Sequence, residues 1–335
     1  MSNKKFFIYG AVIFLIIFSL AFVIQQKFLN KPEPKNEVQQ DQPRQEIKIM
    51  YSITSFSALP IVIAQKAGLF EKYNLPVVLY EQTSPSVSVK SLAAKEIDYL
   101  PFASEGTVAS QKGLPVKTFM LFSENNPYFL VGQKGSKIND IKNIGLGVGI
   151  PMHFYVAKKF ILENDIPAEI IYINNVSAVT AALKSGSVDA VIRSIPDVFK
   201  LHMEEFPILK DFNIQIGQGL ITYDDKIKNN PEEVKKIIQA IKEAISFIKN
   251  KPEETKKILL ENWKMDDNET NRKIVDDSYD IMKKSFLENG PTEGTAVDML
   301  VRIAKAGDFK YPQDVDGQIV TTEDIAKSFD FSLIK

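Results

Sequence analysis

The stretch IKIMYSITSFSALPIVIAQKAGLF, residues 47–70, decides the fold. Its first five residues alternate between apolar and more polar side chains, which predicts a strand over residues 47–51. A polar loop follows, and the mostly apolar residues 58–67 predict a helix with Pro60 in its first turn, where proline is tolerated. Gly68 is placed to end that helix. This arrangement presents hydroxyl and free N–H groups at the carboxyl end of a strand, where ligands bind in open α/β sheets.

Length and composition set the class of protein. The chain has 335 residues, enough for two lobes and additional elements, with 44% hydrophobic and 25% charged residues, as is ordinary for a folded protein. Its formal net charge of −1 gives no electrostatic case for binding nucleic acid. The absence of cysteine excludes disulfides, thiolate metal sites and a lipid-modified N-terminal cysteine, and only two histidines are present. We therefore expect no metal site and no cofactor.

The N-terminus predicts attachment to a membrane. Residues 6–24 form an uncharged run of 19 apolar or small residues, a length that suits a membrane span better than the core of a cleavable signal. Cleavage after Ala21 is the alternative for this first segment, residues 1–29. Residues 30–46, rich in proline and glutamine, predict a disordered linker. We thus expect a body that begins at residue 47 and is tethered to the membrane.

Short strands and helices alternate along the body, which argues for an α/β fold with mostly parallel sheets covered by helices on both faces. After the first strand, the expected strands span residues 75–80, 97–102, 116–122, 127–132, 144–148, 169–173, 190–193 and 219–223. The expected helices after the first span residues 87–94, 107–112, 151–164, 176–185, 231–250, 252–263, 269–288, 294–306 and 322–329. Asparagine, proline and two glutamates in succession predict the start of the helix at residue 231, with Asn230 as its cap.

Two segments of the body repeat one pattern. Leu92 precedes Asp98 and Leu183 precedes Asp189, each by six residues, and each pair lies in a predicted helix, tight turn and strand. Their place in two similar units favours a duplicated architecture. We expect both aspartates to cap local turns and not to contact a ligand.

Four groups of motifs carry a resemblance to a known family, and they cover about residues 47–264. They are AQKAGLF followed by EKYNLPVVLY; the pair SLAAKEIDYLPFAS and ALKSGSVDAVIRSIPD; PYFLVGQKGSKINDIKNIGLGVG; and NNPEEVKKIIQAIKEAISFIKNKPEETKKILLEN. In this order they resemble type 2 periplasmic solute-binding proteins of ABC importers, in particular the receptors for nitrate, taurine, alkanesulfonates and thiamine-pyrimidine precursors.

The resemblance implies a two-lobed fold, with two doubly wound, mostly parallel sheets joined by a hinge of two crossovers. Lobe one would comprise residues 47–126 and 219–335, and lobe two residues 127–218. The crossovers would lie near residues 123–131 and 216–221, and the lobes would close on a ligand.

Two departures from the family limit what can be carried over. The chain has its own predicted membrane span, whereas relatives are often soluble or lipid-anchored. Ser194 and Ile195 precede Pro196 where many relatives have an aromatic and an acidic residue. The identity of the ligand is therefore not transferable.

The resemblance, together with the predicted span, implies a monomeric, membrane-tethered extracytoplasmic receptor that captures a small polar solute, ring-containing or anionic, and delivers it to an ABC permease. An enzyme of the same fold acting on a pyrimidine or aromatic metabolite is one alternative, but a pyrimidine synthase of this fold uses a cysteine-rich motif that is absent here. No nucleophile or acid–base pair stands out, so we expect no catalytic residues. A tethered sensory module is a further alternative.

The candidate ligand-binding residues of lobe one follow predicted strands. They are Ser55, Phe56, Ser57, Thr83, Ser84, Ser104 and Glu105. Hydroxyl and N–H groups would contact the ligand, and Phe56 would stack on it; the alternative is that Ser57 caps the helix. Thr83 and Ser84 would contact ligand or form a capped turn. Glu105 would pair with a ligand amine, or remain a solvated loop charge.

The candidates of lobe two surround a helix start and two strand ends. They are Gly149, Met152, His153, Tyr155, Asn174, Asn175 and Arg193. A glycine lets a ligand approach the backbone, and the helix N-terminus favours negative charge. His153 and Tyr155 would hydrogen-bond or stack, and the two asparagines would donate amides or cap a helix. Arg193 would bind an anion; an ion pair with Asp197 is the favoured alternative.

Overall fold

The structure is a computed structural model of the whole chain. It describes residues 45–53, 55–81, 85–148, 150–174, 176–212, 217–291, 294, 295, 298 and 328–334. The chain divides into two units, residues 1–44 and 45–335. The expected membrane span and nearly all of the expected linker lie outside the described residues. Among the residues that are described, no helix is long and apolar enough to cross a membrane.

The opening stretch folds as its pattern predicts. It forms β1 (Ile47–Tyr51), the 3₁₀ turn η1 (Phe56–Ala58) and α2 (Leu59–Lys66), in which Pro60 occupies the first turn. Gly68 ends this helix in a left-handed conformation, with φ of 69°, and α3 (Leu69–Lys72) follows. The chain then returns as β2 (Val77–Glu81), which pairs with β1 in parallel.

A second pair of strands extends this layer. β3 (Val116–Leu121) pairs with β9 (Gly219–Tyr223) in an antiparallel arrangement. The strand expected over residues 97–102 is wrong, because only two isolated bridges form there, from Tyr99 to Ile49 and from Leu100 to Ile221. Pro101 follows immediately and has no N–H group to continue a ladder. These bridges connect the two pairs, and we call β1, β2, β3 and β9 the four-strand group.

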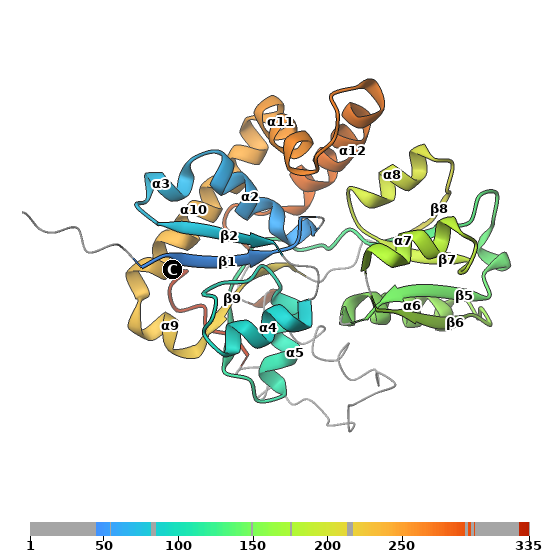
Figure 1. Ribbon diagram of the computed structural model, residues 1–335. Coiled ribbons are helices and arrows are strands. Elements are labelled where there is room, and N and C mark those ends of the chain that lie inside the picture. Colours follow the sequence, from blue (N-terminus) through green and yellow to red (C-terminus); the bar gives the residue numbers. More distant parts are fainter. Residues whose placement is uncertain are drawn as a thin grey trace, which may run out of the picture. The chain divides into compact units, whose positions relative to one another are not determined.

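All strands of a second sheet come from residues 129–211. They are β4 (Phe129–Gly132), β5 (Asn143–Gly147), β6 (Glu169–Ile173), β7 (Ala190–Arg193) and β8 (Ile208–Asp211). The order is β6-β5-β7-β4-β8. The expectation of a mostly parallel sheet holds for β5, β6 and β7, but β4 pairs antiparallel with both β7 and β8. In Figure 1 this five-stranded sheet lies to the right of β1, β2 and β9.

Helices cover both faces of the five-stranded sheet, as expected. The α6 helix (Pro151–Glu163) shares a core with Leu130 and Ile192, whereas α7 (Val176–Lys184) and α8 (Asp197–Met203) share another with Val131 and Val191. Neighbouring residues of a strand point to opposite faces, so β4 and β7 each contribute side chains to both cores. The α8 helix and the β8 strand, both short, were not expected from the sequence.

The remaining helices surround the four-strand group. They are α4 (Pro85–Ala93), α5 (Ala103–Gln111), α9 (Asp224–Asn229), α10 (Pro231–Asn250), α11 (Pro252–Asn262) and α12 (Glu269–Ser285). The α10 helix buries apolar residues at spacings of three and four against α2 and α3, as its pattern predicts. Asn230 occupies the N-cap position, but its side chain makes no capping hydrogen bond. The helices expected at 294–306 and 322–329 lie almost entirely outside the described residues.

The two repeated aspartates have one structural role, which differs from the local capping that we expected. Asp98 accepts a hydrogen bond from the Lys48 N–H of β1 at 2.8 Å. Asp189 accepts hydrogen bonds from the N–H groups of Lys142 and Asn143, at the start of β5, at 2.9 and 3.0 Å. Each carboxylate thus holds the beginning of a neighbouring strand, which supports the duplicated design.

Candidate functional site

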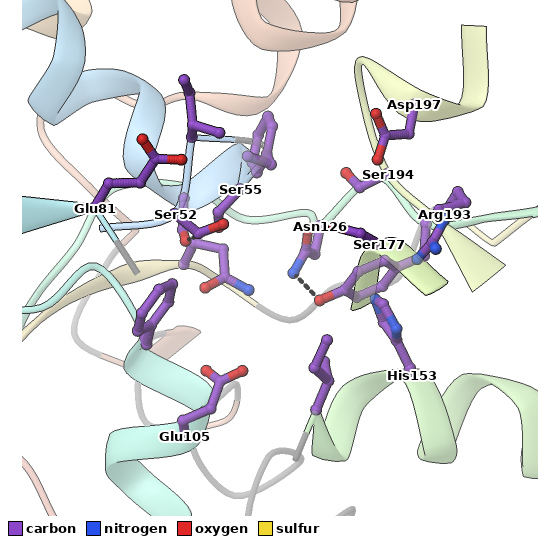
Figure 2. Close-up of a pocket in the computed structure, with 17 residues that line it drawn as sticks. Ser52, Ser55, Glu81, Glu105, Asn126, His153, Ser177, Arg193, Ser194 and Asp197 are labelled. Carbon is purple, nitrogen blue, oxygen red and sulfur yellow. Dashed lines mark hydrogen bonds between the residues drawn. The ribbon is translucent and has the colours of Figure 1, made fainter. Parts of the chain in front are cut away.

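A cavity of about 210 Å³ lies where strand ends of the four-strand group face those of the five-stranded sheet. One side is lined by Ser52, Ile53, Ser55, Phe56, Ser57, Glu81, Phe102 and Glu105. The other is lined by Tyr128, Ile150, His153, Ser177, Arg193, Ser194 and Asp197, with Asn126 and Gln218 from the two connecting segments. Figure 2 shows Ser52, Ser55 and Glu81 on one side, His153 and Arg193 on the other, and Asn126 between them.

The loop after β1 supplies hydroxyl groups to this cavity. Ser55 and Ser57 lie 2.8 Å apart through their Oγ atoms. Ser57 does not cap α2, since Ala58 occupies the N-cap position, so that alternative is wrong. The ring of Phe56 is stacked on Phe286, with centroids 4.5 Å apart, so one of its faces is already covered. Phe56 therefore offers the cavity an edge or its remaining face.

Glu105 enters the cavity from the first turn of α5. Its neighbour Gly106 lets the helix approach β9 closely, because a Cβ atom there would lie 2.6 Å from side-chain atoms of Ile221. Ser104 Oγ donates a hydrogen bond to the Glu105 carboxylate at 2.6 Å. Burial nevertheless raises the pKa of Glu105, and the hydrogen bonds from Ser104 and from its own backbone only partly oppose this effect. This half-buried carboxylate in the cavity wall can accept a hydrogen bond from a ligand.

The opposite wall is built on β7 and α6. Arg193 is the last residue of β7 and is only 3% exposed; its Nε donates to Thr180 Oγ1 at 2.9 Å. Burial lowers the pKa of Arg193, and the negative charge of Asp197 acts against this. His153 lies in the first turn of α6, which starts at Pro151.

His153 is a buried, neutral imidazole. Burial, together with the positive charge of Arg193, lowers the pKa of His153 to about 3. Its ring meets the Tyr128 ring edge to face, with centroids 4.9 Å apart. Its Nδ1 atom is buried and has no hydrogen-bond partner among the described residues. An unsatisfied buried polar atom is rare in a folded protein, and this one belongs to a residue that lines the cavity.

The two connecting segments contribute amide groups. Asn126 Nδ2 donates to the Tyr128 hydroxyl at 2.7 Å, which orients both side chains at the cavity (Figure 2). Gln218 is anchored through its backbone: its N–H donates to Ser123 Oγ at 2.8 Å, and its carbonyl accepts from the Phe122 N–H at 2.9 Å. The two connections therefore lie side by side next to the cavity.

The structure brings six of the predicted site residues together around the cavity: Ser55, Phe56, Ser57, Glu105, His153 and Arg193. Four others lie elsewhere. Ser104 supports Glu105, Met152 is buried in a core cluster, Tyr155 packs against that cluster, and Asn174 is exposed beyond β6. The remaining four, Thr83, Ser84, Gly149 and Asn175, lie outside the described residues.

Several residues of the lining were not predicted from the sequence. Glu81 ends β2, one residue beyond the expected strand, and Ser52 follows β1 directly. Asn126 and Gln218 lie in or beside the two expected crossovers, which was a usable signal, because chain segments that connect two lobes pass beside the cleft. Asp197, considered only as a partner of Arg193, also lines the cavity and pairs with Lys200 at 3.5 Å. Within the described ranges, no group of three His, Asp or Glu side chains could hold a metal ion.

Comparisons with known proteins give the chain a family and a fold. A profile of the family described as NMT1/THI5 like matches residues 55–255. Compared by sequence with curated proteins, the chain finds no match.

Solved structures include similar proteins. The periplasmic aliphatic sulphonate binding protein SsuA from Escherichia coli has a TM-score of 0.64 and 14% identity, covering 82% of this chain and 95% of that chain. The alkanesulfonate-binding protein SsuA from Xanthomonas axonopodis pv. citri, bound to MOPS, has a TM-score of 0.66 and 13% identity, covering 78% and 91%. The periplasmic nitrate-binding protein NrtA from Synechocystis PCC 6803 has a TM-score of 0.64 and 14% identity, covering 86% of each chain. At these identities, the likeness establishes the periplasmic binding protein fold.

Proposed function

Because the chain belongs to the NMT1/THI5-like family, we propose that it is an extracytoplasmic receptor that captures a small solute and delivers it to an ABC permease. The observation that carries the proposal is the polar cavity, which is lined from both groups of strands. A volume of about 150 Å³ accommodates a benzene molecule, so a cavity of about 210 Å³ suits a solute with a single ring. The neighbours named above bind sulfonates and nitrate, which are solutes of similar or smaller size.

The receptor works as two lobes that close on the solute. Lobe one comprises residues 47–126 and 219–335, and lobe two comprises residues 127–218. Support comes from the paired connections between them, where Gln218 hydrogen-bonds to both Phe122 and Ser123. Two short connections that run together act as a hinge and limit the motion to opening and closing.

Side chains of both lobes take part in capture. Ser55, Ser57 and Glu105 bind from lobe one, and His153 and Arg193 bind from lobe two. A ligand held by both lobes interacts better with the closed state than with the open one, and this difference in affinity drives closure.

The receptor is tethered by residues 6–24, with the body outside the cytoplasm. Support comes from the length and the lack of charge of this run and from the polar linker that follows it. Cell fractionation followed by N-terminal sequencing tests the tether: an intact N-terminus in the membrane fraction is expected, whereas a mature chain that begins after Ala21 would contradict it.

A thermal-shift screen tests the function. Pyrimidines, sulfonates, nitrate, riboflavin-like rings and aromatic acids are added to the full-length protein, and a bound solute should raise Tm by mass action. Replacing Arg193 or Ser55 by alanine should weaken binding of any compound found, whereas replacing the exposed Asn174 should not. A compound recovered chemically unchanged supports a receptor and not an enzyme, and a screen in which no solute binds would contradict the proposal.

A further inference from the structure

The charges around the cavity are unequal. Three carboxylates line it, those of Glu81, Glu105 and Asp197, but Arg193 is the only lysine or arginine that the structure describes in its lining. His153 does not add a positive charge, because its pKa is lowered to about 3. The lining therefore carries more negative than positive charge, although the chain as a whole is nearly neutral, with a net charge of −1.

The positive charge of Arg193 is partly offset within its own wall. Its Nε donates to Thr180, and the charge of Asp197 acts on its guanidinium. Asp197 is a neighbour in the same wall, four residues along the chain. Asp197 also pairs with Lys200 at 3.5 Å, and burial still lowers the pKa of Arg193, so Asp197 offsets the charge of Arg193 only in part.

The carboxylates of the other wall have no such balance. Among the residues that the structure describes, no lysine, arginine or histidine forms an ion pair with Glu81 or Glu105. Within the described ranges, Ser104 is the side-chain donor to Glu105. A buried carboxylate is stabilised by a cation or by several hydrogen-bond donors, and here the cavity is the open side from which they can come.

A second, independent observation concerns His153. Its side chain is 93% buried, as its exposed fraction is 7%, and it lines the cavity with Nδ1 unpartnered among the described residues. When the ring proton is on Nε2, Nδ1 is a hydrogen-bond acceptor. In that tautomer, an N–H group of a solute would satisfy Nδ1, which a fully deprotonated anion such as nitrate cannot do.

We propose that the solute is a small organic cation with N–H donors, an ammonium or amidinium, and that Glu105 binds its charged group. This proposal rests on the receptor function proposed above and names the class of solute. The rings of Phe102 and Tyr128, which also line the cavity, favour a cation over an anion, because aromatic faces attract positive charge. The sulfonate and nitrate specificities of the structural neighbours therefore do not extend to this cavity.

The test compares two probes of the same shape and opposite charge. Benzamidine and benzoate each carry one planar charged group on a phenyl ring, and benzenesulfonate and nitrate extend the anionic set. Binding to the full-length protein in mild detergent is measured by thermal shift and titration calorimetry, with probes up to about 10 mM. We expect benzamidine to raise Tm and the three anions to leave it unchanged.

Two variants assign the effect to the carboxylate. Glu105→Gln keeps the shape of the side chain and should weaken benzamidine binding by about 10- to 100-fold. Glu261→Gln, on the exposed surface of α11, is the matched control and should leave the affinity unchanged. Since Glu105→Gln removes a buried charge, the unliganded variant should be at least as stable as the wild type, so weaker binding would not reflect misfolding. Glu81→Gln, at a more exposed position, should have a smaller effect of the same sign.

The outcomes separate this inference from the function. If benzoate, benzenesulfonate or nitrate stabilises the protein and benzamidine does not, the solute is an anion and the inference is overturned, while the receptor function stands. Equal benzamidine affinity for Glu105→Gln and the wild type also overturns it. Failure of benzamidine and simple amines to bind overturns the inference, and failure of every solute in the wider screen overturns the receptor function itself.

Discussion

His153 makes the stability of the protein sensitive to acid. Its pKa of about 3 in the folded state lies below its ordinary value of 6.5, because burial and Arg193 disfavour the imidazolium. Between these two values the unfolded chain binds the proton and the folded chain does not, so stability falls as pH falls. Relative to a His153→Gln variant, the wild type should lose about 3 kcal/mol between pH 7 and about pH 4.

Urea denaturation at a series of pH values measures this difference. His202→Gln is the control, because His202 is exposed on α8, and it should follow the wild-type pH dependence. A His153→Gln variant with the same acid sensitivity as the wild type would show that the imidazole is not buried as described.

Lys226, a buried residue of α9, joins two carboxylates beside the four-strand group. Its Nζ lies 2.8 Å from both Asp98 and Glu233, and the residue is only 7% exposed. Lys226→Met should cost about 3–5 kcal/mol, because it leaves two carboxylates without their cation. The exposed pair of Lys95 and Asp225 provides the comparison, and Lys95→Met should cost less than about 1 kcal/mol. Similar costs for the two variants, measured by urea denaturation, would contradict the role given to Lys226.

At the level of single residues, the sequence predicted the region of the site more accurately than the individual side chains that line the cavity. Glu105, His153 and Arg193 were predicted because they follow strands or begin helices. Met152 precedes His153 by one residue, and successive residues of a helix are turned by about 100°, so one faces the core and the other faces the cavity. Which residue of such a pair faces the cavity depends on how the helix packs, and the local sequence pattern does not determine this.

At the level of helices and strands, the close contact between α5 and β9 positions Glu105. Gly106→Val would place side-chain atoms against Ile221 and push the helix away from the strand. We expect a cost of about 1–3 kcal/mol from overpacking, although valine is the better helix former, so helix propensity alone predicts the opposite sign. Urea denaturation measures this effect, and a Gly106→Val variant more stable than the wild type would contradict the close approach.

Helices and strands were predictable where the hydrophobic pattern agreed with residues that commonly begin or end such elements. The bounds of β1, β6, β7 and β9 are those expected, and α10 begins at the predicted proline. The missed elements lack such signals. The β8 strand has four residues, two of them charged, at the edge of its sheet, and α9 has no apolar stripe beyond Ile227. Their position is fixed by neighbours that lie far away in sequence.

For the molecule as a whole, the paired connections couple the two groups of strands. Ser123→Ala would leave the buried Gln218 N–H without its acceptor. We expect a loss of about 1–3 kcal/mol in unfolding free energy, together with weaker ligand binding, since the same contact positions Gln218 at the cavity. Ser185→Ala, on an exposed turn, should change neither. Unchanged stability and affinity in Ser123→Ala would show that the connections move independently.

At this scale, the alternation of strands and helices and the order of the motifs predicted the α/β class and the periplasmic binding protein fold. The charge of the cavity could not be predicted in the same way. Glu81 and Glu105 come from different elements, and Arg193 and Asp197 come from a third region of the chain. Only folding brings their charges together around one cavity, so no local pattern records the balance.

The five-stranded sheet is built from one continuous segment, whereas the four-strand group is not. The β3 strand cannot form its pairing with β9 until β9 has been synthesised, which happens only after all five strands of the other sheet. Moreover, Phe129 and Asp211, at the two ends of the continuous segment, are partners across β4 and β8. As the chain leaves the ribosome, the five-stranded sheet can therefore be completed first, while β1, β2 and β3 are still without their last strand. Protease treatment of stalled nascent chains of increasing length should show residues 127–212 becoming resistant before residues 47–126.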